Sequence, residues 1–296
     1  MTEVTDSVKA EDRPFETVDW TMVSAISVIW GSSFLFMAIG LESFEPGLVS
    51  LLRVGFGAAT AAFLPGARKA VPREAWPRIV VLGFVWLAFP LTLFPIAQQW
   101  IDSSVAGMLN SAMPLMTLFI AWAAFSTPTG PRRLFGVLVG LVGIVLIGAP
   151  EASTAGTNAV GVLLVVLAVS SYGLAANIAG PLQRAHGSLP VISRALMVAT
   201  LFSVPLGLYA VPASSFSWSS LAACAAVGVG GTGIAYSLAA TLVGRVGAVR
   251  MSIVTYIIPV VSVVLGVALN GETVSGWAIV GTGVVLAGAL LSSRVD

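Results

Sequence analysis

A stretch of the chain occurs twice at a spacing of 145 residues, and this repeat limits the folds that the sequence can adopt. The first copy reads AGMLNSAMPLMT around Pro114, and the second reads MSIVTYIIPVVS around Pro259. An apolar run and a short polar turn follow each copy, and Gly143 matches Gly288. A long repeat has to be recognised first because it sets the architecture. Both copies lie in apolar segments long enough to cross a bilayer, which is typical of a transporter with two related halves.

The composition excludes a water-soluble globular protein. Only 9% of the 296 residues are charged and 57% are hydrophobic, with a mean hydropathy of +0.98, whereas a soluble domain carries about 25% charged residues. The net charge of +1 gives no indication of a nucleic-acid partner. The single cysteine, Cys224, rules out a disulfide framework and a cysteine-based metal site. We therefore expect a protein embedded in the lipid bilayer, with no cofactor and no metal.

Ten apolar segments each approach the ~20 residues that a bilayer requires. The expected spans are Trp20–Gly40, Gly47–Gly66, Ile79–Gln99, Ser103–Phe125, Leu134–Ala149, Ala159–Gln183, Pro190–Val211, Ser219–Val243, Ala248–Asn270 and Trp277–Ser293. Residues 1–19 are polar, and we expect a short cytoplasmic tail without a cleavable signal peptide. The predicted fold is an all-α membrane protein with one five-helix repeat at 20–150 and a second at 159–294.

The basic residues indicate the orientation through the positive-inside rule. With the N-terminus inside, the cytoplasmic ends of the helices carry Lys9, Arg13, Arg68, Lys69, Arg73, Arg78, Arg132, Arg133, Arg184, Arg194, Arg245, Arg250 and Arg294. The outer loops carry Glu42, Glu45, Asp102, Glu151 and Glu272 but no Lys or Arg. Ten spans return the C-terminus to the cytoplasm, and we expect a multi-pass protein of the bacterial inner membrane.

Each repeat holds an odd number of helices, so the second copy is expected to be inverted relative to the first. Arg53 and Arg194 support this expectation because they occupy equivalent positions near the start of the second helix of each half. Arg53 falls towards the outer face and Arg194 near the inner face. Inverted repeats of this kind place a substrate site near the midplane, in a central cavity between the halves.

Pro114 and Pro259 are each expected near the middle of a spanning helix, where proline frees the carbonyl four residues earlier. Each shares its helical face with polar residues: Asn110 and Thr117 in the first half, and Ser252, Thr255 and Ser262 in the second. These residues either face the cavity or only bend the helices, with their hydroxyls bonded to their own backbone. The duplication favours the cavity.

Aromatic residues with polar tips form a second candidate set. Trp30, with Ser33 beside it, lies in the middle of the first helix and aligns with Tyr172 in the sixth. The other candidates lie nearby in the sequence or in neighbouring helices, namely Trp86, Trp100, Asn177, Tyr236 and Tyr256. A buried aromatic residue of this kind needs a polar partner, which a pocket would provide. The alternative is an interfacial anchor, which we assign to Trp20, Trp76, Trp218 and Trp277.

Arg53 is the basic residue that fits the predicted topology least well, because it falls towards the outer face. It can extend to the outer interface, pair with Glu42 or Glu45, or pair with the carboxylate of a substrate. The sequence leaves these alternatives open, whereas for Arg194 we expect a structural role close to the cytoplasmic surface.

The other ionisable residues and motifs exclude several functions. The glycine run from Gly228 to Gly233 fits a dinucleotide-binding pattern, but it lies within a membrane helix and is better explained by helix packing. His186 is expected to be solvated in a loop. The sequence shows no intramembrane acid or histidine of the kind that proton-coupled carriers and cation exporters usually keep. This absence favours a neutral or zwitterionic substrate and a carrier that is uncoupled or weakly coupled to ions.

The sequence resembles the drug/metabolite transporter superfamily, in its branch of two EamA domains. The resemblance rests on the Trp30-Gly-Ser-Ser-Phe segment, Arg53, the Pro114 and Pro259 helices, and the Gly271-Glu272 pair. The first copy departs from this pattern, with Ser126-Thr127 in place of Gly-Glu. The resemblance implies two inverted five-helix halves, alternating access and export of small metabolites. Within the superfamily, the aromatic and uncharged pocket looks most like that of the YddG-type amino acid exporters.

The sequence therefore predicts a secondary transporter that exports amino acids or similar neutral or zwitterionic metabolites. The main alternative is an exporter of drugs or other metabolites on the same fold. Minor alternatives are a passive channel and an intramembrane enzyme, for which no nucleophile–base pair is found. The oligomeric state is left open, a monomer included.

Overall fold

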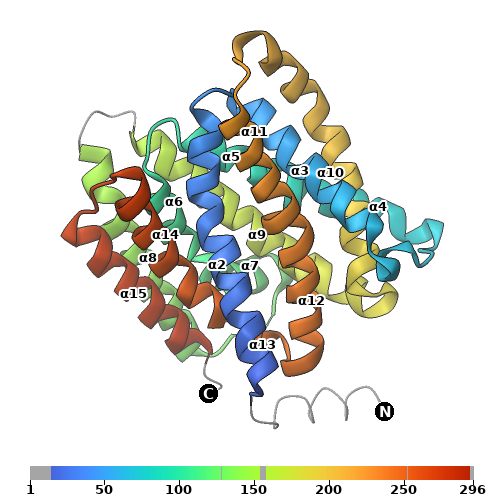
Figure 1. Cartoon of the computed structure of the whole chain (residues 1–296). Helices are drawn as coiled ribbons and strands as arrows, with labels where there is room; N and C mark the ends of the chain where they lie inside the picture. Colours follow the sequence, from blue (N-terminus) through green and yellow to red (C-terminus); the bar gives the residue numbers. More distant parts are fainter. Residues whose placement is uncertain (1–14, 128, 154–157, 252, 294–296) are drawn as a thin grey trace.

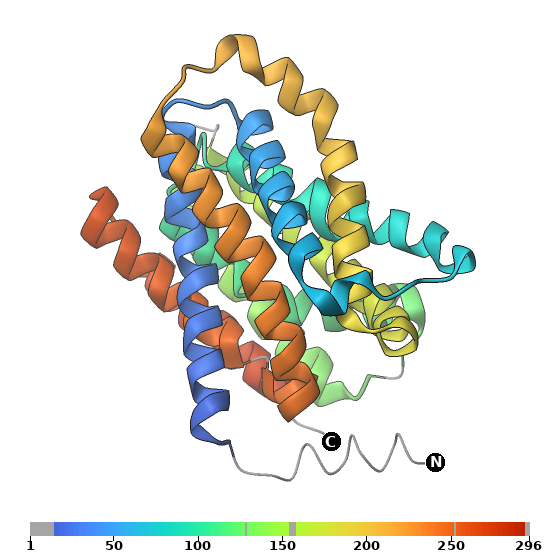
Figure 2. The ribbon, with the colours of Figure 1, turned by 45° about the vertical axis from the view of Figure 1, so that its right-hand side comes forward.

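The protein is a bundle of helices, shown in Figures 1 and 2. The computed structural model describes residues 15–127, 129–153, 158–251 and 253–293, and these residues form no strand. The helices in chain order are α2 (Thr17–Leu41), α3 (Pro46–Phe63), η1 (Pro65–Arg68), η2 (Arg73–Ala75), α4 (Trp76–Leu82), η3 (Gly83–Ala88), α5 (Phe89–Ala97), α6 (Ser103–Asn110), α7 (Met113–Phe125), α8 (Pro131–Ser153), α9 (Asn158–His186), α10 (Ser188–Ala210), η4 (Val211–Ala213), α11 (Trp218–Ala225), η5 (Ala226–Ile234), α12 (Ala235–Val246), α13 (Ala248–Met251), α14 (Ile253–Asn270) and α15 (Gly276–Ser293).

The described residues contain nine helices that are long and apolar enough to cross a membrane, with mean hydropathies between 1.3 and 2.3. Helices α6 and α7, which meet at a bend of 44°, together form a tenth candidate span. The predicted number of spans is therefore confirmed, with ends that shift by a few residues. For example, α2 begins at Thr17 rather than Trp20, because Glu16 and Asp19 form a capping box ahead of the apolar segment.

The two ends of the bundle are defined by where the first and last spans begin and end. Helix α2 begins and α15 ends at the lower end in Figure 1, which we call the terminal end. The opposite end, where α2 finishes, is called the distal end. Successive spans alternate in direction between these two ends, as the sequence predicted for a multi-pass membrane protein.

The two proline helices are less alike than the sequence predicted. In the first half the helix breaks at Ser111 and Ala112, and Pro114 lies in the first turn of α7 rather than in the middle of a helix. Proline is well tolerated in a first turn, where its missing N–H has no intrahelical partner to lose. In the second half α14 runs from Ile253 to Asn270 with Pro259 inside it. The expected bend therefore appears in the first half as a break between two short helices.

Helices α8 and α15 pack against each other through glycines at equivalent positions of the repeat. A Cβ atom at Gly143 would lie 2.7 Å from the Gly281 carbonyl, and one at Gly281 would lie 2.8 Å from the Gly143 carbonyl. Gly136 and Gly288 approach each other in the same way, at 2.7 and 2.6 Å. The absence of side chains lets the two backbones come close, as is common between membrane helices. The reciprocity of these contacts is what an inverted pair of repeats produces.

The second helix of each half packs on the third helix of the other half. Helix α3 lies against η5, and α10 lies against η3. A Cβ atom at Gly228 would lie 2.5 Å from the Phe56 Cβ, and one at Gly57 would lie 2.6 Å from the Thr232 Cγ2. The glycine run that begins at Gly228 is thus a helix-packing surface, as the sequence predicted.

Helices α7 and α14 end in the same way although their sequences differ. Ser126 and Gly271 both adopt positive φ angles, of 51° and 65°. In each case the next residue, Thr127 or Glu272, donates its backbone N–H to a carbonyl in the last turn, at 3.0 and 3.1 Å. This pattern is a common helix ending, and glycine adopts it without steric cost whereas serine does not.

Glu272 also joins the two halves at the distal end. Its carboxylate accepts hydrogen bonds from the backbone N–H groups of Ser103 and Ser104, at 3.0 and 2.9 Å, at the start of α6. The Ser103 hydroxyl and the Asn270 amide donate to the same carboxylate, at 2.6 and 2.9 Å. Burial alone would raise the pKa of Glu272, but the hydrogen bonds outweigh it and hold this pKa below the ordinary value. The glutamate of the Gly271-Glu272 pair therefore caps a helix of the opposite repeat.

We expect Glu272→Gln to lower the unfolding temperature of the purified protein by several degrees. The amide NH₂ would face a backbone N–H donor of α6, which corresponds to the loss of about 1–2 kcal/mol for a helix cap. Because the folded-state pKa is lowered, the stabilisation is present above the ordinary carboxyl pKa and is lost as the pH falls through the lowered value. Thermal unfolding in detergent over a pH series measures both effects. Glu42→Gln, at an exposed distal position, is the matched control, and equal shifts in the two variants would contradict the capping role.

Candidate functional site

Helix α2 runs through the bundle between α14 on one side and η5 and α12 on the other (Figure 1). A Cβ atom at Gly31 would lie 2.6 Å from the Val261 Cβ, so the absence of a side chain at this position permits the contact with α14. On the other side, Ser33 faces Gly231, where an added Cβ would lie 2.6 Å from the serine Oγ. The segment Trp30-Gly-Ser-Ser is thus held between helices of the second half.

Three of the candidate aromatic residues contact one another between the halves. The Trp30 and Tyr236 ring centroids are 5.6 Å apart, and those of Trp86 and Tyr236 are 5.4 Å apart, both with edge-to-face geometry. The Trp30 indole N–H donates to the Gly231 carbonyl at 2.9 Å. We call Trp30, Trp86 and Tyr236 the aromatic cluster. Its members come from α2, η3 and α12, and their predicted place in the wall of a substrate cavity stays a prediction.

Both halves contain a π-helical segment next to this cluster. Segment η3 contains Trp86, and segment η5 directly precedes α12, which carries Tyr236. Each segment also accepts a side-chain hydrogen bond, from Ser171 to the Val85 carbonyl in η3 and from Trp30 to the Gly231 carbonyl in η5. Wider turns of this type are frequent at functional sites because they offer carbonyls and redirect side chains.

Tyr172 belongs to a second group of rings. It stacks on Phe94 with the centroids 6.0 Å apart, and Phe94 meets Phe34 edge to face at 5.5 Å. Tyr172 is buried, as is Phe94. The sequence did not identify Phe34 and Phe94 as members of this group, because a phenylalanine in a long apolar segment carries no signal that separates it from its neighbours.

Arg53 points into the bundle. It is 7% exposed, and its guanidinium donates to the Thr232 hydroxyl at 3.3 Å and to the Met37 sulfur at 3.0 Å. No carboxylate of the described residues forms an ion pair with it, and Glu42 and Glu45 are exposed. Of the alternatives that the sequence left open, extension to the interface and pairing with these glutamates do not occur in this structure.

Other candidate residues lie apart from the aromatic cluster. Trp100 is at the distal end, where its Cβ lies 3.3 Å from the position that a Cβ on Gly161 would take. Asn177 donates to the Thr117 and Gly173 carbonyls, at 3.1 and 2.9 Å, and so fastens α9 to α7. Tyr256 is half-buried on α14 and packs against the apolar core.

The polar residues on the faces of the two proline helices fall into two groups, those with a structural role in this structure and those whose role stays a prediction. The Thr117 and Ser262 hydroxyls bond back to their own helices, at 2.9 and 3.0 Å, which agrees with the structural alternative for these two residues. Asn110 and Thr255 are half-buried, and their predicted role in the cavity stays a prediction. Ser252 lies outside the described residues.

The described part of the chain keeps its buried acids at the two ends of the bundle. Asp19 and Glu272 are the buried carboxylates there, at the terminal and distal ends respectively. No group of three or more His, Cys, Asp or Glu residues in this part could hold a metal ion.

Two open surface hollows, of about 530 and 560 Å³, are formed by α7 with its following turn and by the first turns of α2. Neither of these hollows includes a residue of the aromatic cluster.

Comparison with known proteins agrees with this architecture. The EamA-like transporter family matches residues 20–149 and again residues 159–294. An uncharacterized inner membrane transporter of Escherichia coli K12, YedA, is 26% identical over 90% of this chain and 88% of its own. A probable amino-acid metabolite efflux pump of Salmonella typhimurium is 21% identical over 93% and 94% of the two chains. One solved crystal structure matches with a TM-score of 0.62 and 19% identity over 94% of this chain and 97% of that chain, which supports the fold alone.

The family model covers both halves of the chain. The relatives are named as transporters or efflux pumps, and the match covers nearly the whole length of each. The chain therefore belongs to the EamA-like transporter family, within the drug/metabolite transporter superfamily, and is a membrane transporter rather than an intramembrane enzyme.

Proposed function

We propose that this transporter exports small neutral or zwitterionic metabolites, above all amino acids with neutral or aromatic side chains, by alternating access. The proposal places it in the bacterial cytoplasmic membrane with the terminal end of the bundle inside. The basic residues Arg68, Arg78, Arg132, Arg184 and Arg250 support this orientation, because the order of the spans along the chain puts each of them at a helix end or turn on the side where α2 begins and α15 ends.

The observation that carries the proposal is the aromatic cluster at the interface of the two halves. Its rings offer apolar faces, while the phenol of Tyr236 and the carbonyl groups of the π-helical segments offer polar contacts. Small-molecule sites combine these features, with mostly apolar walls and a few polar groups that fix orientation. The described mid-membrane residues add no carboxylate, so the cluster suits uncharged or zwitterionic molecules better than cationic drugs. Two relatives named as probable amino-acid metabolite efflux pumps point to the same class of substrate.

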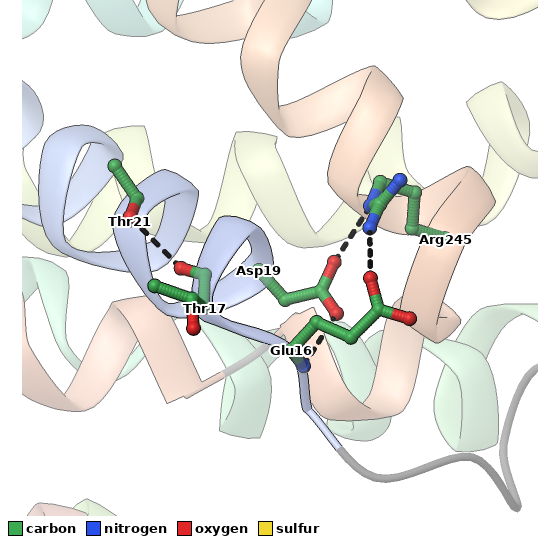
Figure 3. Close-up of polar contacts among 5 residues, drawn as sticks. All are labelled: Glu16, Thr17, Asp19, Thr21 and Arg245. Atoms are coloured by element: carbon green, nitrogen blue, oxygen red, sulfur yellow. Dashed lines mark hydrogen bonds and ion pairs between the residues drawn. The ribbon is translucent and has the colours of Figure 1, made fainter.

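Two helix contacts, equivalent under the repeat, are suited to act as gates. At the terminal end α2 meets α12, where Arg245 binds Asp19 at 2.6 Å and Glu16 at 3.0 Å (Figure 3). Asp19 is fully buried. At the distal end α9 meets α5, where Gly161 packs on Trp100 and Ala97 without any charge. We propose that these contacts open in alternation, and that the ionic contact keeps the terminal gate closed in the conformation seen here.

Arg245→Gln should make the terminal gate open more often, because it removes the ionic contact that joins α12 to the buried Asp19 of α2. Ser27→Cys in a Cys224→Ser background provides the probe, since Ser27 is buried on α2, two turns beyond Asp19 on the same face. We expect N-ethylmaleimide to alkylate this cysteine several-fold faster when Arg245 is replaced. Arg78→Gln, which alters an exposed charge near the start of the span Arg73–Ala97, is the control. Arg245→Lys should give an intermediate rate, and equal rates in all variants would exclude a gate at this contact.

Counterflow in proteoliposomes tests the substrate class. Vesicles loaded with unlabelled phenylalanine, methionine or threonine should take up the labelled amino acid saturably without any ion gradient. Trp30→Ala should lower exchange of phenylalanine relative to threonine by about two- to tenfold, as expected for lost ring contacts of ~0.5–1.5 kcal/mol. Trp218→Ala, at a site 76% exposed, should leave this ratio unchanged.

The other outcomes of this experiment separate the alternatives. Equal effects of the two tryptophan substitutions would remove the aromatic cluster from the site. Folded protein that exchanges no amino acid would favour export of drugs or other metabolites, or obligate coupling to an ion. Flux that neither saturates nor shows counterflow would indicate a channel.

A further inference from the structure

Arg53 is a buried cation whose hydrogen-bonding capacity is only partly used. A guanidinium carries several N–H donors, arranged in a fork that matches a carboxylate. In this structure the donors reach one hydroxyl, that of Thr232, and one thioether sulfur, that of Met37, which is a weak acceptor. The remaining donors have no protein acceptor among the described residues, although the side chain is only 7% exposed.

Arg194, at the equivalent position of the second half, provides an internal comparison. Its guanidinium donates to the backbone carbonyls of Pro190 and Ala67 at 3.0 and 3.2 Å, and to that of Lys69 at 2.8 Å. These carbonyls lie in α10 and in the turns after α3, so Arg194 fastens two elements together. A structural role accounts for Arg194, as the sequence predicted, but the contacts of Arg53 are fewer and weaker.

The surroundings of Arg53 favour an anion that arrives from outside the chain. An ionised side chain inside a membrane protein is costly and commonly marks a substrate or ion pathway. Arg53 extends between α2, α3 and η5. Its partner Thr232 directly follows Gly231, whose carbonyl accepts the indole N–H of Trp30 in the aromatic cluster. A molecule with a carboxylate at one end and an apolar body at the other would find complementary groups for both ends.

We propose that Arg53 binds the carboxylate of the transported metabolite, so that the transporter selects substrates that carry a free carboxylate next to an apolar body. This proposal rests on the function proposed above and narrows its substrate class. In the absence of substrate, Thr232 and Met37 hold the guanidinium between the helices. On binding, the carboxylate accepts hydrogen bonds from the remaining N–H groups and neutralises the charge of Arg53 before the substrate crosses the membrane. Arg53 is thus a specificity-determining residue for the translocation of a zwitterion.

The test compares phenylalanine with two analogues in counterflow by the wild-type protein. Phenylalaninamide and phenethylamine keep the aromatic body and the amino group but lack the carboxylate. We expect labelled phenylalanine to exchange with unlabelled phenylalanine at least about tenfold faster than with either analogue, because a buried charged donor left unpaired penalises binding of the analogue. This comparison needs no variant and is therefore independent of the effect of any substitution on folding.

Arg53→Met tests the residue itself. We expect phenylalanine exchange to fall at least about tenfold and the preference for the acid over the amide to disappear, whereas Arg53→Lys should keep part of both. Arg194→Gln is the matched control: it should reduce thermal stability, but the folded protein should keep the preference for the acid. A merely structural role of Arg53 would instead lower the amount of folded protein without changing the preference in the remainder.

The failures of the two proposals are distinguishable. If the wild-type protein exchanges phenylalanine and phenylalaninamide equally well, the transporter still carries amino-acid-like substrates but Arg53 does not bind their carboxylate. If it exchanges no amino acid at all, the proposed function fails and the role of Arg53 fails with it.

Discussion

The bilayer's inability to satisfy polar groups is the constraint on which this structure depends. Backbone groups within the spans bond inside their own helices, and the buried carboxylates of Asp19 and Glu272 sit at the two ends with donors around them. Arg53 departs from this pattern, because its partners within the described residues are a hydroxyl and a thioether. A charge retained under such conditions is most simply explained by a ligand that completes its coordination.

The symmetry of the two halves and its local failures together suggest how the molecule works. Matching glycines join α8 to α15, and each half provides a π-helical segment against the second helix of the other. The charged contacts of the described residues, in contrast, differ between the two halves. Arg245 forms an ion pair at the terminal end whereas the equivalent distal contact is apolar, and Glu272 caps α6 whereas its counterpart is Thr127. Repeats of this kind can adopt two related conformations, and interactions of unequal strength at the two ends determine which conformation is favoured.

The spans, the repeat and the central position of Trp30 and Tyr172 could be predicted because each leaves a direct mark on the sequence. Long apolar runs report helices that cross a membrane, and matched positions report a duplicated half. The break before Pro114, in contrast to the continuous α14 around Pro259, could not be predicted because tertiary packing decides how a helix accommodates proline. The π-helical segments and the ring contacts of Phe34 and Phe94 have no distinguishing residue pattern. The burial of Arg53 required the arrangement of α2, α3 and η5 around it.

A structure of the transporter with bound phenylalanine would show whether the substrate binds between the two halves. We expect density for the carboxylate within hydrogen-bonding distance of the Arg53 guanidinium, with the side chain against Trp30, Trp86 or Tyr236. Ligand density at the lipid-facing surface, or in the interface but without contact to Arg53 or the aromatic cluster, would contradict this expectation.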